Sequence, residues 1–333
     1  MSRHDALQQW LEQRWYGPIP PNRLLRLFAG LFGLLARGRR AAYQRGWLRS
    51  TRLPVPIVVV GNISIGGVGK TPLTLALVDA LRARGWRPGV ISRGYGGSAR
   101  DATRVGPQSS PAEVGDEPCL IQWRSGAPVA VAPRRVAAAE LLLASGEVDV
   151  LIADDGLQHY ALQRDVEIVV IDGQRRFGNG RLLPAGPLRE PIQRAARAAF
   201  RVVNGAAAGA DEWEMRLELQ AAVPLQGGKA IALNELRGPV HAVAGIGHPA
   251  RFFQALGRHG LDYIEHPFPD HHAFLPGDFA FDDGRPLLMT EKDAIKCRAF
   301  ARPHWYAVPA QAILPAAFFD EINRDICAAR GLV

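Results

Sequence analysis

The hydrophobic positions of the chain fall into short apolar runs that alternate with stretches of helical periodicity. The runs are rich in β-branched residues and are bounded by Pro or Gly, which is typical of buried parallel strands. They lie at residues 56–62, 89–92, 129–132, 148–153, 166–171 and 200–203. A helical pattern separates several of them, most clearly at 133–145. This alternation predicts an α/β fold with a mostly parallel sheet flanked by helices, whose ligand binds at the carboxyl ends of the strands.

A second, smaller set of signals follows in the C-terminal part of the chain. Apolar runs at 239–246 and 287–290 accompany two helical patterns, one starting at Pro249 and the other at Pro315. We therefore expect a smaller C-terminal α/β domain. The predicted sections are an N-terminal arm at 1–53, a main domain at 54–205 and the smaller domain at 206–333.

The N-terminal arm contains an amphipathic stretch, LLRLFAGLFGLLA, at residues 24–36. As a helix it would span about 20 Å, which is too short to cross the hydrocarbon core of about 30 Å. At helical spacing the flanking arginines form one stripe, and the leucines fall on another face. Such a helix can lie in a membrane interface, with leucines among acyl chains and arginines among anionic headgroups. Equally open is a helix packed on the body of the protein with a solvated arginine face.

The net charge of +8 belongs to this arm, because residues 1–53 hold ten arginines against Asp5 and Glu12. The rest of the chain is balanced, which argues against a general nucleic-acid-binding body. Only four of the 40 basic residues are lysines, so a lysine at the junction of a loop and a helix needs its own explanation. The three cysteines are far apart, which excludes a disulfide framework and a structural zinc site and fits a reducing cytosol.

A glycine-rich segment, SIGGVGKT at 64–71, lies between the first strand and a helix with Pro72 in its first turn. This order of strand, loop and helix is the context of a phosphate-binding loop, or P-loop. Its backbone N–H groups surround phosphate oxygens, and its lysine reaches the β- and γ-phosphates. The pattern departs from GxxxxGK[ST] at the first position, where serine replaces glycine. The candidate nucleotide-binding residues are Ser64, Gly66, Gly67, Gly69, Lys70 and Thr71, the last also a Mg²⁺ ligand through its hydroxyl.

Two carboxylates, Asp154 and Asp155, follow the apolar strand at 148–153. An NTPase places its second Mg²⁺ contact at such a strand end, directly or through water. Adjacent aspartates at a strand end can also be turn or helix caps. The phosphate loop upstream favours the magnesium interpretation and leaves open which carboxylate would bind the ion directly.

Eight short motifs extend these signals over most of the chain. In order, they are GNISIGGVGKTP (61–72), SRGYGG (92–97), VGDEP (114–118), DDGLQH (154–159), LPAGPLRE (183–190), AGIGHPARFF (244–253), PDHH (269–272) and TEKDAIK (290–296). Together they resemble the tetraacyldisaccharide 4′-kinases, the lipid A 4′-kinases, from about residue 50 to 310. The combination is far more specific than the phosphate loop alone.

This resemblance implies an ATP- and Mg²⁺-dependent kinase with a P-loop NTPase-type domain and a smaller C-terminal α/β domain. Its substrate would be the tetraacyldisaccharide 1-phosphate precursor of lipid A, phosphorylated on the 4′-hydroxyl to give lipid IVA. Such enzymes act on the cytoplasmic face of the inner membrane. The resemblance therefore favours peripheral contact of the basic arm with an anionic membrane surface. It implies no nucleic-acid ligand, and no protein partner can be inferred.

The resemblance also assigns roles to individual residues, beginning with the loop and strand-end residues named above. Asp116, in VGDEP, matches the carboxylate proposed as base toward the sugar hydroxyl, and His271, in PDHH, matches the histidine that supports it. Arg189 and Glu190 match charged residues near the phosphates and the metal, and Arg93 is a weaker candidate for the same region. On pattern alone, Asp116 would be a helix cap on a loop and His271 a loop histidine. Whether the two touch is left open.

Two other classes of function are open as well. GGVGKT also resembles the loop of nucleotide switches and partitioning ATPases, which often carry a membrane-seeking amphipathic helix. Those proteins usually have another lysine early in the loop, where this chain has Ile63, Ser64 and Ile65. Their membrane helix is also commonly C-terminal. A membrane-anchored binding module with a degenerate loop would leave Lys70, Thr71 and Asp155 unexplained.

Overall fold

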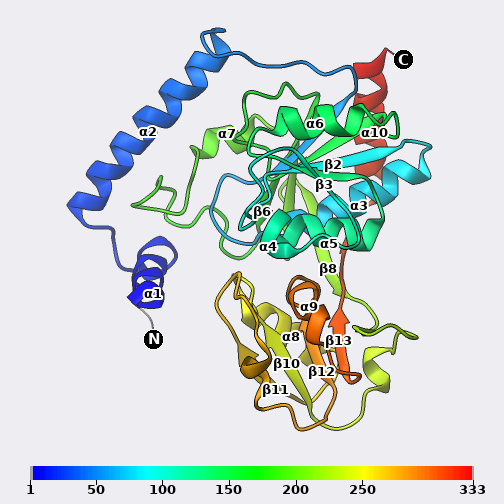
Figure 1. Ribbon diagram of the computed structural model, residues 1–333. Helices are drawn as coiled ribbons and strands as arrows, with labels where there is room; N and C mark the ends of the chain where they lie inside the picture. The colour runs from blue at the N-terminus through cyan, green and yellow to red at the C-terminus, as the bar shows by residue number, and fades with distance from the viewer. Residues whose placement is uncertain (1–2, 332–333) are drawn as a thin grey trace. The chain divides into compact units, whose positions relative to one another are not determined.

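The computed structural model describes residues 3–331, which form two compact units built from interleaved stretches of chain (Figure 1). Within these limits the first unit comprises the residues up to 70, then 149–216, and those from 314 onward. The second unit comprises residues 71–148 and 217–313. The predicted sections at 1–53, 54–205 and 206–333 stay a prediction.

A parallel sheet forms the centre of the first unit. Its strands lie in the order β8-β7-β6-β1-β5, and each neighbouring pair is parallel. The strands are β1 (Ile57–Gly61), β5 (Val150–Asp154), β6 (Val166–Asp172), β7 (Phe200–Asn204) and β8 (Trp213–Leu219). β1 and β5 are buried along their whole length, which explains their unbroken apolar sequences. The end of β1 lies beside the end of β5, where Val60 pairs with Asp154.

The first unit also contains helices, which contact the rest of the unit in different ways. They are α1 (Arg3–Trp15), α2 (Arg23–Gln44), α7 (Ile192–Ala196) and α10 (Ala316–Arg330). α10 packs on the sheet through Phe318, whose ring lies 5.7 Å from that of Phe200 and 5.6 Å from that of Trp213. α1 is held by Trp15, whose indole Nε1 donates a hydrogen bond of 3.0 Å to the carbonyl of Pro184.

The amphipathic stretch forms α2, which is longer than the predicted 24–36. The helix begins after Asn22, whose side chain accepts a hydrogen bond of 2.8 Å from the Leu25 amide. Its buried positions are Ala29 and Gly33, and a Cβ at Gly33 would lie 2.7 Å from the Leu182 side chain. The large apolar side chains are instead exposed: Leu24, Leu27, Phe28, Leu31, Leu34 and Leu35, at 49–69%.

The helix α2 therefore does pack on the body of the protein, but through small residues. The alternative of a helix packed on the body with a solvated arginine face describes only part of α2, because the leucine face is exposed too. Six large apolar side chains on one exposed face form the kind of patch that marks a membrane or protein contact. None of the helices described here has the length and apolar content that a membrane crossing requires.

The second unit begins with a group of helices and short strands. They are α3 (Lys70–Ala83), β2 (Pro88–Ser92), β3 (Thr103–Val105), α4 (Pro111–Val114), α5 (Asp116–Ser125), β4 (Val129–Val131) and α6 (Arg135–Leu143). β2 is parallel to β4, whereas β3 is antiparallel to it. α6 packs on β2 and β4, and corresponds to the helix predicted at 133–145.

A five-stranded sheet completes the second unit, with strand order β11-β10-β12-β13-β9. Its elements are β9 (Val223–Pro224), β10 (Val240–Ala244), α8 (Pro249–Arg258), β11 (Tyr263–Pro267), β12 (Leu287–Thr290), α9 (Glu291–Cys297), β13 (Trp305–Val308) and, beyond the sheet, β14 (Ala310–Ile313). Short 3₁₀ helices lie at Leu233–Glu235, Pro276–Phe279 and Arg298–Phe300. β9 is antiparallel to β13, and the other pairs are parallel. α9 packs on β12, β13 and α5.

Candidate active site

The phosphate loop joins β1 to α3, as predicted, and its lysine is held by polar partners. Lys70 Nζ donates to the Asn62 side-chain oxygen at 3.4 Å and forms an ion pair of 3.6 Å with Asp155. Only 11% of the Lys70 side chain is exposed. Thr71 follows it in the first turn of α3. The lysine is therefore positioned by groups that a phosphate could join or replace.

Glycine is required in the loop for two separate reasons. Gly66 and Gly69 have φ of +101° and +95°, a region that other residues rarely adopt. A Cβ at Gly69 would also lie 2.7 Å from the side-chain nitrogen of Asn204, which donates to the Val68 carbonyl at 3.0 Å. Asn204, at the end of β7, therefore helps to fix the conformation of the loop. The motif analysis missed this residue because it lies far away in the sequence.

The two strand-end carboxylates have different surroundings. Asp154 is the last residue of β5 and is fully buried. Asp155 has φ of +48°, which is unusual for a residue with a side chain. It forms ion pairs with Lys70 at 3.6 Å and with Arg189 at 3.3 Å. Backbone strain of this kind costs about 1–3 kcal/mol and is concentrated at functional sites.

Glu190 lies in a buried network of hydrogen bonds. Its carboxylate accepts from Gln158 at 3.1 Å and from the Tyr160 hydroxyl, and Arg194 Nε lies 3.8 Å away. Burial and the hydrogen bond to Glu190 raise the pKa of Tyr160 to about 12. Gln158 also donates to the Asn62 carbonyl at 2.9 Å, which connects this network to the phosphate loop.

The donors at this edge of the sheet fit a magnesium ion. Mg²⁺ prefers oxygen ligands and is usually held by one or two carboxylates together with substrate phosphates. Asp154 and Asp155 supply carboxylates, and Thr71 supplies a hydroxyl. Within residues 3–331 no three His, Cys, Asp or Glu side chains form a metal-binding group. The individual magnesium ligands stay a prediction.

A second cluster forms around Asp116, which is 6% exposed. His271 Nδ1 donates to its carboxylate at 3.1 Å, so the two residues do touch. The expectation that Asp116 lies on a loop as a helix cap is wrong in detail, because it is the first residue of α5 and Gly115 is the N-cap. His271 has φ of +59°, a second strained position among the candidate residues.

Two lysines of α9 reach the same carboxylate. Lys292 Nζ lies 3.8 Å from Asp116 Oδ2, 3.2 Å from Glu117 and 3.4 Å from His271 Nε2. Lys296 Nζ lies 3.7 Å from Asp116 Oδ2. Sequence reasoning gave neither lysine a role, although both stand in TEKDAIK and lysine is rare in this chain. Those two signals single the lysines out, but they do not indicate that either one reaches Asp116.

This cluster controls the protonation of its members. Burial alone would raise the pKa of Asp116, but the hydrogen bond from His271 and the charges of Lys292 and Lys296 lower it to about 2. The hydrogen bond to Asp116 raises the pKa of His271 above its ordinary value of 6.5, although burial and Lys292 oppose this. Asp116 is therefore ionised at any physiological pH, whereas the protonated form of His271 is favoured relative to a free imidazole.

Arg93 is the candidate with the least structural support. It follows β2 and is exposed, and within residues 3–331 its side chain has no hydrogen bond or ion pair. The neighbouring Tyr95 contacts His271 instead, with ring centroids 5.4 Å apart. The sequence analysis did not single out Tyr95.

The Lys292 contacts predict a shift in the pH dependence of activity. If neutral His271 is needed, kcat/KM falls as the pH drops through its raised pKa, above 6.5. Lys292→Met removes a charge that lowers this pKa, so the acid limb of the profile should move to higher pH. The exposed Lys229→Met serves as control and should not move it. A limb that stays in place, or moves down, in Lys292→Met would contradict this role.

The chain matches a known family over most of its length. Residues 21–327 match the family model described as tetraacyldisaccharide-1-P 4′-kinase, LpxK. The chain belongs to this family. A curated LpxK-family relative, tetraacyldisaccharide 4′-kinase of Stenotrophomonas maltophilia, is 52% identical over 92% of this chain and 93% of its own length. The kinase of Xanthomonas euvesicatoria is 51% identical over 93% of this chain and 95% of its own length.

A solved LpxK structure has the same fold. The Aquifex aeolicus enzyme, crystallised in complex with ATP, aligns with a TM-score of 0.76 and 29% sequence identity. The alignment covers 90% of this chain and 97% of that one. These matches confirm the family, the α/β fold class with its mostly parallel sheet, and the prediction of a lipid A 4′-kinase. They do not test the roles of single residues.

Proposed function

We propose that this protein transfers the γ-phosphoryl group of ATP to the 4′-hydroxyl of tetraacyldisaccharide 1-phosphate, which gives lipid IVA. The observation that carries the proposed mechanism is the contact between Asp116 and His271, in a chain of the LpxK family. Two residues 155 positions apart meet through a charged hydrogen bond, and both belong to motifs of that family.

The nucleotide is bound by the phosphate loop. Its backbone N–H groups and Lys70 contact the phosphates, and Arg189 adds a second positive charge beside Asp155. Asp154, Asp155 and Thr71 would hold Mg²⁺, which when bound neutralises charge on the phosphate oxygens. The oxygens of Glu190 already accept hydrogen bonds from Gln158 and Tyr160. Glu190 would therefore orient these two side chains at least as much as it would bind the ion.

The acceptor hydroxyl is handled by Asp116. Its carboxylate receives a hydrogen bond from His271 on Oδ2, which leaves Oδ1 to accept from the sugar hydroxyl as well as from the Glu117 amide. The transition state of phosphoryl transfer is loose, so the hydroxyl needs to be oriented more than deprotonated early. A carboxylate with a pKa of about 2 suits this role, because it stays ionised and accepts the proton late. His271 holds Asp116 in position and can take up the proton afterwards.

ATP turnover with and without the acceptor tests this function. ADP release should depend on detergent-dispersed tetraacyldisaccharide 1-phosphate. Release at the same rate without lipid would instead favour a membrane-associated switch or partitioning ATPase. An absence of release under both conditions would favour a binding module.

We further propose that the protein associates peripherally with the cytoplasmic face of the inner membrane through α2. The exposed leucine face would enter the acyl boundary, and the arginines at the ends of the helix would lie among anionic headgroups. The acceptor itself carries four acyl chains, so an enzyme that reaches its sugar must work at a lipid surface.

The apolar face of α2 should contribute to vesicle binding in a way that does not depend on the salt concentration. Replacing Leu27, Leu31 and Leu34 together with serine should weaken binding to phosphatidylglycerol vesicles more than about tenfold, since burying one leucine contributes about 1.5–3 kcal/mol. The loss should be equal at low and high salt, because apolar burial is not screened. Leu275→Ser, at a residue 66% exposed in the second unit, is the control in the sedimentation assay. Wild-type protein that stays in the supernatant at both salt concentrations would overturn the membrane proposal.

A further inference from the structure

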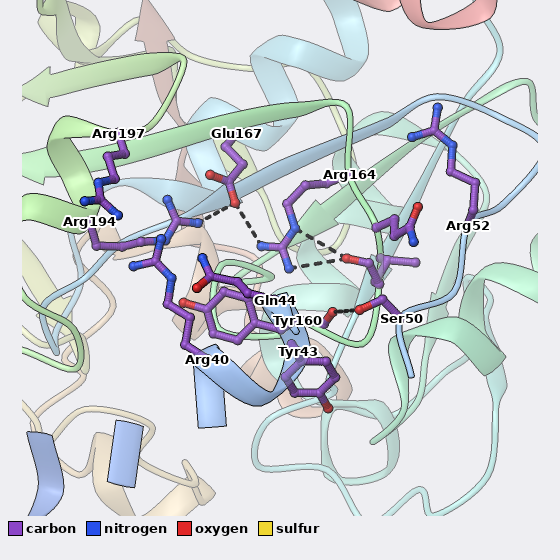
Figure 2. Close-up of a pocket in the computed structure, with 12 residues that line it drawn as sticks. Arg40, Tyr43, Gln44, Ser50, Arg52, Tyr160, Arg164, Glu167, Arg194 and Arg197 are labelled. Atoms are coloured by element: carbon purple, nitrogen blue, oxygen red, sulfur yellow. Dashed lines mark hydrogen bonds and ion pairs between the residues drawn. The ribbon is translucent and has the colours of Figure 1, made fainter. Parts of the chain in front are cut away.

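A pocket of about 390 Å³ lies beside the last turns of α2, within the first unit (Figure 2). Five arginines line it: Arg40 from α2, Arg52 from the segment after it, Arg164, and Arg194 and Arg197 at α7. We call it the arginine pocket. Figure 2 shows Arg40, Arg194 and Arg197 gathered at one end, with Arg52 at the other. Tyr160 and Arg194 also contact Glu190, but the other arginines of the pocket have no part in the nucleotide or acceptor chemistry described above.

Part of this positive charge is already matched. Arg52 pairs with Asp165 at 2.7 Å, and Arg164 pairs with Glu167 at 3.0 Å. Arg194 is bonded to Glu167 too, and its side chain is only 4% exposed. These carboxylates hold the guanidinium groups in fixed orientations, which lowers the entropic cost of binding a further anion.

Among the described residues, the other two arginines of the pocket have no carboxylate partner. In the described part of the chain, the side chains of Arg40 and Arg197 form no ion pair, and Arg197 is exposed. A neighbouring hollow of about 460 Å³ shares Arg40, Arg194 and Arg197, adds Arg37, and has no acidic residue in its lining. The lining of the two hollows therefore carries more arginine than carboxylate, which disfavours a cationic ligand and favours an anionic one.

The polar groups between the arginines suit a phosphate. Tyr43 and Gln44 of α2 supply hydroxyl and amide donors, and the rings of Tyr43 and Tyr160 are 6.0 Å apart. The planar guanidinium group presents paired N–H donors that match two oxygens of a phosphate. Figure 2 shows Gln44 and the two tyrosines between the arginines of the two ends.

The position of the pocket on α2 indicates where its phosphate comes from. If the leucine face lies in the acyl boundary, the opposite face of the helix lies about 10 Å further out, at the level of the headgroups. Arg40, Tyr43 and Gln44 are on α2 near its C-terminal end and line the pocket. The most abundant phosphate at that level is the phosphodiester of a bilayer phospholipid.

We propose that the arginine pocket binds the headgroup phosphate of an anionic phospholipid. This inference rests on the proposed membrane association, and adds a specific lipid site made jointly by α2 and the body of the first unit. General attraction of a basic helix to a charged surface needs no residue from α7. A headgroup site requires Arg197, which lies at the end of α7 and outside the arm.

Titration of the intact protein with dihexanoyl phosphatidylglycerol, kept below its micellar concentration and followed by calorimetry, tests the proposal. We expect saturable binding that Arg197→Gln weakens about tenfold, as the loss of one charge-assisted pair predicts. Arg26→Gln, which removes the same charge from an exposed position on α2 outside the pocket, should change it less than about twofold. Dihexanoyl phosphatidylcholine, whose headgroup is neutral overall, should bind far more weakly.

Other outcomes would overturn the proposal. Absence of saturable binding, or equal effects of Arg197→Gln and Arg26→Gln, would show that no headgroup site exists. Inorganic phosphate binding as tightly as the lipid would identify a free-phosphate site. A raised KM for detergent-dispersed acceptor in Arg197→Gln, without phospholipid present, would assign the pocket to the acceptor's own phosphate. The leucine variants separate this result from membrane association, because they should lose vesicle binding yet still bind the short-chain lipid.

Discussion

Replacing Lys70 with alanine should lower kcat/KM for phosphoryl transfer at least about 10²–10³-fold, the usual cost of removing one preorganised charge from such a site. The lysine lies between Asn62 and Asp155, and its contacts are polar. Its removal leaves the apolar core of the first unit intact, so the thermal unfolding midpoint should change little. Steady-state kinetics and thermal melting followed by circular dichroism check both parts.

Lys229→Ala is the matched control, since it removes the same charge from an exposed position. It should leave kcat/KM within about twofold of wild type. Asp155→Ala should resemble Lys70→Ala, because Asp155 joins Lys70 to Arg189. Full activity in either site variant would mean that the phosphate loop does not bind the nucleotide that reacts.

Asp116→Asn should lower the single-turnover rate about 10²–10⁴-fold, the range typical of a lost general acid–base group. The dissociation constant for ATP should change little, because the proposed partner of Asp116 is the sugar hydroxyl. The amide keeps the size of the side chain but loses the charge that faces His271, Lys292 and Lys296. Rapid-quench kinetics and nucleotide titration separate the two effects.

A double-variant comparison distinguishes a functional pair from two independent residues. If Asp116 and His271 act as one unit, changing both should cost little more than the worse single change. Glu113→Gln, on the neighbouring α4, is the control for loss of one exposed negative charge. A large rise in the ATP dissociation constant of Asp116→Asn with normal single-turnover chemistry would instead move this carboxylate to the metal site.

The parts of the fold that the sequence predicts are those with a single strong signal. β1 and β5 are fully buried, so an unbroken apolar run identifies them. β11 has no fully buried residue, and β9 is only two residues long, so neither gives such a run. The pattern of α2 predicts an amphipathic helix, but it does not predict which side of that helix packs against the protein. Gly33 packs on Leu182 while the leucines stay exposed, because a glycine permits the closest approach.

The residues of the candidate site also differ in how far the sequence alone predicts them. Lys70 and Asp155 are each recognisable from local sequence, Lys70 in a glycine-rich loop between a strand and a helix and Asp155 directly after a buried strand. The contact of Asp116 with His271 spans 155 positions, and only the family motifs indicated that both residues matter. Lys292 and Lys296 depend on the packing of α9 against α5, which no local pattern encodes. Long-range contacts of this kind arise from tertiary packing, which periodicity does not report.

Transfer of labelled phosphate from [γ-³²P]ATP to the lipid acceptor tests the central claim most directly. The wild-type protein should form one labelled lipid with tetraacyldisaccharide 1-phosphate, and phosphorus–proton correlation spectroscopy of a larger preparation should locate the new phosphate on the 4′ carbon. Release of the label as inorganic phosphate with no labelled lipid, or a phosphate on any other hydroxyl, would contradict the account.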